Sequence, residues 1–291
     1  MAIRDCPWLS LNNLVKIPAM GLGVAMIEPG VVMDEAIEAA VAAGYRLFDV
    51  AAFYGNEEAL GSALRKTGIS RDEIFVSTKL RNSQQSYEDA LKAFDLSLKT
   101  LQLDYLDMYL IHWPCPAYDR YREAWRALEH LYESGLVRAI GVSNFNESHL
   151  EQLLASCDVA PVVDQLECNP YLSISSLRRY CMARDIRPEA WFPLGGPLVP
   201  LKGEPAERRV LDDPVLASIG ERYGKSPAQT TLRWHVQSGI VPVPKSSRPS
   251  RLRENISIFD FELTAEEMKT IDGLDFGQRL GPDPDTCNDQ F

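Results

Sequence analysis

Eight short runs rich in apolar and β-branched residues recur along the chain, and segments with apolar residues at helical spacing separate them. The runs are residues 20–24, 45–50, 74–79, 106–112, 137–142, 162–167, 187–192 and 240–244. The helical segments are residues 34–43, 57–66, 87–101, 120–133, 147–155, 174–184 and 227–236. This alternation predicts one α/β domain over residues 1–291, folded as a closed (β/α)8 TIM barrel. An open doubly wound sheet is disfavoured, because no G-x-G-x-x-G motif opens a first helix.

Two segments fall outside the alternation. Residues 8–18, WLSLNNLVKIP, predict a short hairpin that turns at Asn12-Asn13 and caps the bottom of the barrel. Residues 194–213 follow the seventh run and are rich in Gly and Pro. A loop of this length in a compact domain is usually functional or disordered.

Composition limits the possible partners. The chain has 30 Lys and Arg against 41 Asp and Glu, a net charge of −11, so phosphate backbones and anionic bilayers are repelled. No apolar run approaches the roughly 20 residues that span a bilayer, and the N-terminus lacks the layout of a signal peptide. We therefore expect a cytoplasmic monomer without nucleic-acid or membrane partners. The six cysteines show no C-x-x-C spacing, which predicts free thiols and no zinc site.

Polar or aromatic residues stand at the predicted carboxyl ends of seven successive strands, where barrels of this type form their active sites. They are Asp49, Lys79, His112, Ser143 with Asn144, Gln165, Trp191 and Lys245. Taken singly, each is better explained as a surface charge, a structural histidine, a helix cap or a core tryptophan. Their recurrence at one end of the barrel favours a shared site.

Tyr54 lies five residues after Asp49 and makes this site chemically specific. A tyrosine with a pKa near 10 is a poor acid at neutral pH unless a nearby cation favours its phenolate, and Lys79 could supply that cation. Asp49 would keep Lys79 protonated, and His112 could bind the substrate oxygen. This set suits protonation of an oxygen as it becomes an alkoxide, as in hydride transfer to a carbonyl.

Hydride transfer needs a cofactor, and residues 242–255, PVPKSSRPSRLREN, predict a phosphate site. Lys245, Arg248, Arg251 and Arg253 cluster beside hydroxyl groups at the start of a predicted helix. Helix-start amides, hydroxyls and guanidinium groups together bind phosphate well. Considered alone, the segment would be a solvated basic helix end.

Taken together, these motifs resemble the aldo-keto reductase family over almost the whole chain. The resemblance rests on MGLGV, FDVAAFYGNEEALG, STKL, LIHWP, IGVSNF, QLECNP, WFPLG and PKSSRPSRLREN, which follow the family's order. The C-terminal GPDPDT is similar to bacterial 2,5-diketo-gluconate reductase-like members. The resemblance implies NADPH-dependent reduction of a small-molecule carbonyl, with a C-terminal loop over the mouth.

The resemblance also implies roles for individual residues. Tyr54 is the general acid, Asp49 and Lys79 tune it, and His112 positions the carbonyl. The nicotinamide carboxamide is held by Ser143, Asn144 and Gln165, and Trp191 stacks on its ring. The cofactor's 2′-phosphate and adenine are bound by Lys245, Ser246, Arg251, Glu254 and Asn255. Ala25 and Trp113 are implied as substrate-binding residues, and no metal is implied.

Four positions depart from the family pattern. Val50 replaces a frequent threonine, and Phe192 stands where a small or hydroxyl-bearing residue is usual. Ala25 replaces a bulky aromatic, which would make the pocket roomier, and Arg248 adds a cation. The loops 113–119 and 195–213 and the tail 276–291 would select the substrate. Cys115 is expected to be structural, although a thiol near the mouth could react with electrophiles.

Two other functions remain open from the sequence. The barrel could be a cofactor-binding sensor or regulatory subunit with vestigial catalysis, although all four proposed catalytic positions are intact. A metal-dependent hydrolase or isomerase is disfavoured, because only four histidines exist and three are predicted in helices or their caps.

Overall fold

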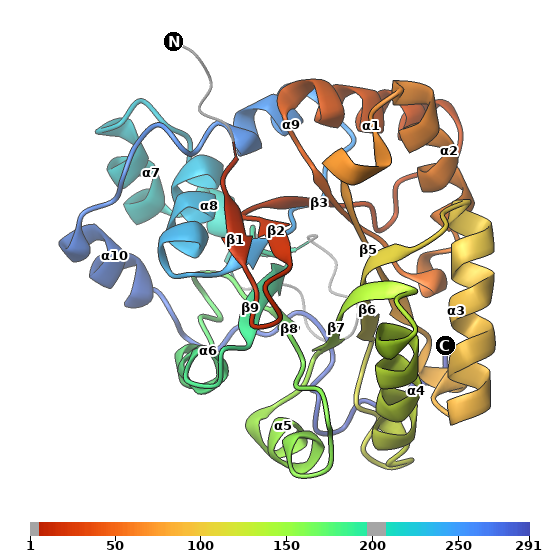
Figure 1. The fold of residues 1–291 in the computed structure, drawn as a ribbon. Helices are drawn as coiled ribbons and strands as arrows, with labels where there is room; N and C mark the ends of the chain where they lie inside the picture. The colour runs from red at the N-terminus through yellow and green to blue at the C-terminus, as the bar shows by residue number, and fades with distance from the viewer. Residues whose placement is uncertain (1–5, 197–207) are drawn as a thin grey trace.

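The computed structural model describes residues 6–196 and 208–291, and eight parallel strands form a barrel inside a ring of helices (Figure 1). The strand order is β10-β9-β8-β7-β6-β5-β4-β3, so each strand pairs with its neighbours in sequence. The strands are β3 (Gly21–Gly23), β4 (Leu47–Asp49), β5 (Phe75–Leu80), β6 (Leu106–Ile111), β7 (Val137–Ser143), β8 (Val163–Glu167), β9 (Arg187–Trp191) and β10 (Val241–Pro242). All eight predicted strands are confirmed, several of them shorter than predicted.

A parallel bridge between Gly23 and Lys245 joins the first strand to the last and closes the barrel. The Gly23 amide donates to the Pro244 carbonyl at 3.2 Å. A Cβ at position 23 would lie 2.9 Å from the carbonyl oxygen of Val243, so the closing strands can approach this closely only because residue 23 is glycine.

The predicted N-terminal hairpin is confirmed as β1 (Trp8–Ser10) and β2 (Lys16–Pro18), with Asn12 and Asn13 in the turn. Their side-chain amides donate to the carbonyls of Pro161 and Arg138, each at 3.0 Å. The hairpin packs with the lower barrel residues in one apolar cluster: Leu11, Ile17, Leu47, Phe75, Met108, Leu110, Ala139, Val162, Val163, Val241 and Val243. One end of the barrel is therefore filled and closed by apolar side chains.

Side chains of alternate strand residues point to the same face of the sheet, and this period of two positions the site. On β4 the apolar Leu47 belongs to the lower cluster, and Asp49, two residues on, forms polar contacts with β5 and β8. On β5, Phe75 belongs to the lower apolar cluster, and Lys79, four residues on, contacts Asp49. The barrel interior thus changes from apolar to polar toward the carboxyl ends of its strands.

Within the described residues, ten helices and four short 3-10 segments fill the connections. The helices are α1 (Val31–Ala43), α2 (Glu57–Thr67), α3 (Tyr87–Leu101), α4 (Tyr121–Glu133), α5 (Glu147–Leu154), α6 (Ser175–Met182), α7 (Pro214–Glu221), α8 (Pro227–Gln237), α9 (Pro249–Ile256) and α10 (Ala265–Asp272). The 3-10 segments are η1 (Ala52–Tyr54), η2 (Arg71–Glu73), η3 (Asn82–Gln84) and η4 (Val210–Asp212).

The seven helices predicted from apolar spacing and the helix start at residues 249–256 are confirmed within a few residues. Helices α7 and α10 were not predicted, because they lie outside the strand–helix alternation. Each begins with a capping residue, Asp213 in α7 and Thr264 in α10, and these residues could have predicted the two helix starts from the sequence. Of the predicted long loop 194–213, residues 197–207 lie outside the described residues.

Candidate active site

A buried ion pair joins the ends of β4 and β5. The Lys79 Nζ lies 2.8 Å from Asp49 Oδ1 and 2.7 Å from Oδ2, and it also donates to the Val50 carbonyl at 3.1 Å. The side chain of Lys79 is 0% exposed and that of Asp49 is 4% exposed. The Ser77 hydroxyl donates to Asp49 Oδ1 at 2.9 Å, so the carboxylate is fixed from two positions on β5.

The environment of Lys79 keeps it charged. Burial by itself would lower its pKa, but the attraction of Asp49, the neighbouring Tyr54, the hydrogen bonds that Lys79 donates to Asp49 and the nearby carboxyl group of Glu189 together raise it. The predicted role of Asp49 in keeping this lysine protonated therefore agrees with the geometry.

Tyr54 ends η1 beside this pair, and its ring centre lies 5.4 Å from Lys79 Nζ. Burial raises its pKa, the charge of Lys79 lowers it, Asp49 raises it, and a hydrogen bond with Lys79 lowers it. The net direction is upward. The expectation that Lys79 brings this pKa below its usual value is therefore wrong for the structure without ligand, because desolvation outweighs the lysine's effect. Tyr54 stays protonated at neutral pH, which a proton donor requires.

His112 follows β6 and faces Tyr54, with ring centres 6.0 Å apart and an interplanar angle of 82°. Burial lowers its pKa well below the usual value, and the positive charge of Lys79 adds to the effect. The imidazole is therefore neutral at pH 7 and has one N–H to donate. Its Nδ1 is buried and has no hydrogen-bond partner within the described residues.

A chain of hydrogen bonds connects the strand ends from β7 to β9. The Trp191 indole N–H donates to Asn144 Oδ1 at 2.8 Å, and Asn144 Nδ2 donates to the His112 carbonyl at 2.9 Å and to Ser143 Oγ at 3.0 Å. Ser143 Oγ in turn donates to the Gln165 carbonyl at 2.8 Å. Asn144 has a φ of 64°, in the left-handed region that asparagine tolerates better than most residues. These predicted cofactor residues are thus held together before any ligand binds.

The predicted phosphate segment forms the loop between β10 and α9. Lys245, Arg248 and Arg251 are exposed, and none of them forms an ion pair with a residue that the structure describes. Ser246 is buried and accepts from the Arg248 amide at 3.2 Å.

Glu254 and Asn255 occupy the last turn of α9. One carboxylate oxygen of Glu254 accepts from Ser226 at 2.5 Å, which ties it to the N-cap of α8, and Asn255 is buried. The side chains of Lys245, Arg248 and Arg251, which form no ion pair with a described residue, thus remain as a group of cations next to the start of α9.

Aromatic side chains surround the candidate catalytic residues at the mouth. Phe291 packs on Phe53 with ring centres 4.0 Å apart, and on His112 at 5.3 Å. The ring centres of Trp113 and Trp191 lie 6.4 Å apart, and Trp113 is buried. The predicted coverage of the mouth by the C-terminal segment is confirmed by these contacts.

Glu167, at the end of β8, binds this C-terminal segment. Its two carboxylate oxygens accept from the amides of Leu280 and Gly281 at 2.7 and 2.8 Å. A Cβ at position 281 would lie 2.4 Å from the Trp191 ring, so the segment passes directly over that indole.

The model of the Aldo/keto reductase family matches residues 19–275, most of the barrel. The chain belongs to the aldo/keto reductase family. The glyoxal reductase of Bacillus subtilis is 47% identical over 277 residues, covering 95% of this chain and 96% of that protein. Methylglyoxal reductase DkgA of Yersinia pestis is 43% identical over 283 residues, covering 96% of each. A Bombyx mori aldo-keto reductase solved in complex with NADP aligns with a TM-score of 0.87 at 34% identity, covering 95% of both chains.

Within the aldo/keto reductase, the departures from the family pattern have structural consequences. Phe192 has a φ of 48° and packs against Trp191 with ring centres 4.8 Å apart, so its ring supports the indole. Cys115 is fully buried and burial raises its pKa to about 12, which agrees with the expected structural role and disfavours the alternative of a reactive thiol. Ala25 is half-buried after β3, and Val50 is fully buried.

Sequence reasoning missed several residues that complete the site. Glu189 and Ser77 lie two residues before Trp191 and Lys79, so the strand period could have placed them on the same inner face. Phe291 and the segment that binds Glu167 lie in the tail 276–291 that was predicted to select the substrate, but their individual contacts could not be predicted, because their position depends on how the chain returns over the barrel.

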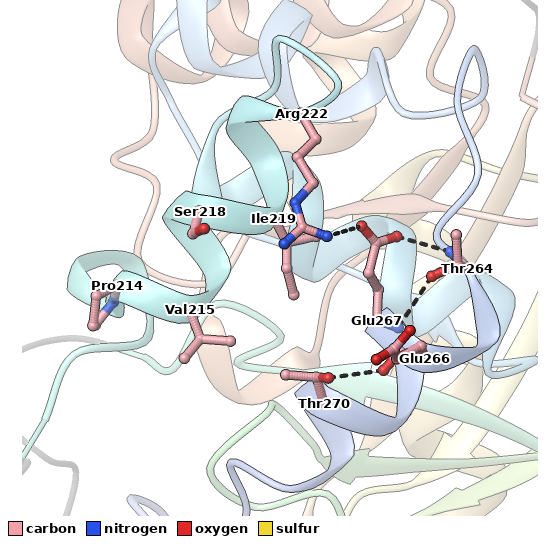
Figure 2. Close-up of a pocket in the computed structure, with 9 residues that line it drawn as sticks. All are labelled: Pro214, Val215, Ser218, Ile219, Arg222, Thr264, Glu266, Glu267 and Thr270. Atoms are coloured by element: carbon pink, nitrogen blue, oxygen red, sulfur yellow. Dashed lines mark hydrogen bonds and ion pairs between the residues drawn. The ribbon is translucent and has the colours of Figure 1, made fainter.

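Two further features lie outside the site. A surface pocket of about 370 Å³ lies between α7 and α10, where Figure 2 shows Arg222 directed at Glu267. These two form an ion pair at 3.2 Å, and none of the candidate site residues lines the pocket. Among the described residues, no helix is long and apolar enough to cross a membrane, and no group of three His, Cys, Asp or Glu could hold a metal ion.

Proposed function

We propose that this aldo/keto reductase uses NADPH to reduce aldehyde or ketone groups of small molecules to alcohols, with Tyr54 as the general acid. The observation that supports it most directly is the buried Asp49–Lys79 pair beside a protonated tyrosine and a neutral histidine. This arrangement suits delivery of one proton to an oxygen that is gaining negative charge.

Each residue of the group has a separate task. When bound, the reduced nicotinamide supplies the hydride that adds to the carbonyl carbon. Tyr54 gives its hydroxyl proton to the carbonyl oxygen, so the products are an alcohol, oxidised cofactor and a phenolate. The charge of Lys79 stabilises that phenolate until solvent returns the proton. Neutral His112 donates its N–H to the carbonyl oxygen and so orients it.

The residues present fit an NADPH molecule in two places. Ser143, Asn144 and Gln165 would hold the carboxamide, and the Trp191 indole would stack on the nicotinamide ring. Lys245, Ser246 and Arg251 would bind the 2′-phosphate, since the charges of Lys245 and Arg251 are not paired within the described residues and Ser246 adds a hydroxyl group. Glu254 and Asn255 would lie near the adenine, where Glu254 has one oxygen engaged by Ser226.

Arg251→Ala is expected to weaken the binding free energy of NADPH by about 1–3 kcal/mol, because a charge-assisted contact to the 2′-phosphate is lost. Binding of NADH should stay nearly unchanged. Titration of both cofactors by fluorescence measures the difference. Arg253→Ala is the matched control, since this arginine is exposed on the same helix and, although it belongs to the basic segment, is not among the residues proposed to contact the 2′-phosphate. Equal weakening of both cofactors by the Arg251 change would contradict a phosphate contact.

We infer that small 1,2-dicarbonyl compounds are preferred substrates. The relatives named glyoxal reductase and methylglyoxal reductase support this class. The ring of Phe291 against His112 also supports it, because an aromatic wall so close to the histidine favours compact substrates. Ala25 and Trp113 would contribute the remaining walls.

Turnover tests this function directly. NADPH consumption, followed by the absorbance of the reduced nicotinamide, is measured with small aldehydes, dicarbonyls and keto-sugars. We expect glyoxal-type compounds to give the highest kcat/KM. NADPH binding without turnover of any member of the panel would instead favour a cofactor-binding sensor.

We further infer that the enzyme works as a monomer in the cytoplasm. Its six cysteines are all free thiols, which supports a reducing compartment. Sedimentation at several protein concentrations would measure the oligomeric state, and a stable dimer would contradict the monomer.

A further inference from the structure

A second carboxyl group is buried beside the Asp49–Lys79 pair. Glu189 lies on β9, is 0% exposed and stands opposite Gln165 in the register of β8 and β9. Gln165 Nε2 donates to Glu189 Oε1 at 2.5 Å and to Asp49 Oδ1 at 3.0 Å. One amide group therefore bridges the two carboxyl groups.

The hydrogen bonds identify which carboxyl is ionised. Asp49 Oδ1 accepts from Ser77, Lys79 and Gln165, and Oδ2 accepts from Lys79, so this group is surrounded by donors. Glu189 receives one hydrogen bond, from Gln165. Within residues 6–196 and 208–291, its Oε2 has no hydrogen-bond partner and no cation lies within ion-pair distance. Burying an ionised Glu189 with one unpartnered oxygen and no cation within ion-pair distance would be strongly unfavourable.

We propose that Glu189 is a positioning residue, which orients the Gln165 amide while it remains an uncharged carboxylic acid. The proposal rests on the assignment of Gln165 to the cofactor under the proposed function. Glu189 would act through Gln165 and would not itself touch the reacting atoms.

The charge of Asp49 decides which Gln165 atom is shared, and Glu189 holds the amide in place by accepting its second hydrogen. An ionised carboxylate can only accept hydrogen bonds, so the Gln165 atom that it shares with Glu189 must be the nitrogen. Both hydrogens of Nε2 are then used. Gln165 Oε1 is left to bind a further group, and it suits an N–H donor such as a carboxamide.

The charged groups that act on Glu189 are Asp49 from β4 and Lys79 from β5, with neutral Gln165 from β8 and Tyr54 next to Lys79. Burial and the charge of Asp49 raise the pKa of Glu189, Gln165 and Lys79 lower it, and the net result is a rise from 4.5 to about 8. Because the folded pKa is raised, this carboxyl's contribution to stability is complete below pH 4.5 and is lost as pH rises to about 8. Ionisation above that pH adds a negative charge near Lys79 and makes Tyr54 a weaker acid.

The test compares Glu189→Gln, which has the shape of the uncharged acid, with Glu189→Leu, which removes the acceptor. NADPH Kd is measured by fluorescence, and kcat for reduction of glyoxal is measured across the pH range around 8. We expect the Gln variant to stay within about two-fold of wild type in Kd. It should also lack the fall in kcat that wild type shows as pH rises through about 8. The Leu variant should weaken NADPH by about ten-fold, because Gln165 loses a partner.

Each other outcome is decisive. An equal loss in the Gln and Leu variants would overturn the proposal, because it would mean that the charge of Glu189 is needed. A Leu variant with unchanged Kd would also overturn it. Should the Leu variant not fold, the pH profile of the Gln variant decides: an alkaline fall identical to wild type overturns the proposal, and its loss supports it.

Failure of the proposed function is separable from failure of this proposal. Tyr54→Phe, measured in the same series, tests only whether the Tyr54 hydroxyl is the proton donor. The Kd of NADPH is measured independently of turnover. Full activity of Tyr54→Phe would contradict the assigned acid and would leave the Kd comparison at Glu189 intact.

Discussion

Tyr54→Phe is expected to lower kcat for carbonyl reduction by about 10²- to 10⁴-fold, because it removes the proton source and leaves the ring in place. The ring packs 6.0 Å from His112 and 5.4 Å from Lys79 Nζ, and Phe can keep both contacts. The measurement is the steady-state rate of NADPH consumption with glyoxal, at neutral pH.

The control for this variant is cofactor binding, measured by fluorescence titration. We expect its NADPH Kd to remain near the wild-type value, since the predicted cofactor contacts lie on other strands. If binding falls in proportion to the rate, Tyr54 is a cofactor contact and the acid must be sought elsewhere.

Lys79→Met is expected to have the second large effect, on both stability and rate. It leaves Asp49 buried without its cation, and breaking such a pair costs about 3–5 kcal/mol of unfolding free energy. It also removes the charge that stabilises the Tyr54 phenolate, so kcat should fall by at least about 10²-fold. Urea unfolding followed by circular dichroism gives the stability, and the same NADPH assay gives the rate.

Lys66→Met is the matched control, because the pair of Lys66 with Asp34 is exposed. The side chains of Lys66 and Asp34 are 60% and 33% exposed, and such a pair contributes at most about 1 kcal/mol. A loss of stability at Lys79 no larger than that at Lys66 would show that the buried pair has little structural role. The two readouts separate the roles, since a rate loss without a stability loss would place Lys79 in catalysis alone.

The residues proposed as catalytic could be picked out because strand ends are readable from sequence. Asp49, Lys79 and His112 each follow an apolar run, and a parallel barrel brings successive carboxyl ends to one mouth. Short-range patterns therefore predicted which side chains meet, although they lie up to 63 positions apart in the chain. The hairpin over the barrel bottom was predictable for a similar reason, from a turn between two short apolar runs.

The energetic balance at the site was not predictable in the same way. The pKa of Tyr54 depends on how fully the phenol is desolvated against how close Lys79 lies, and both quantities are properties of the packed barrel. The structural role expected for Cys115 could be separated from the reactive alternative only in the folded chain, because burial, which raises the pKa of the thiol, cannot be read from a position near the mouth.

The sequence by itself determined the alternation of strands and helices, the polar ends of the strands and the basic segment before α9. These features depend on periodicity and on residue type, which are local properties of the chain. The tertiary structure alone decided that Glu189 shares Gln165 with Asp49, that Glu167 binds the C-terminal segment and that Phe291 packs on His112. Those contacts join residues from distant parts of the chain, and only the closed barrel fixes the distances between them.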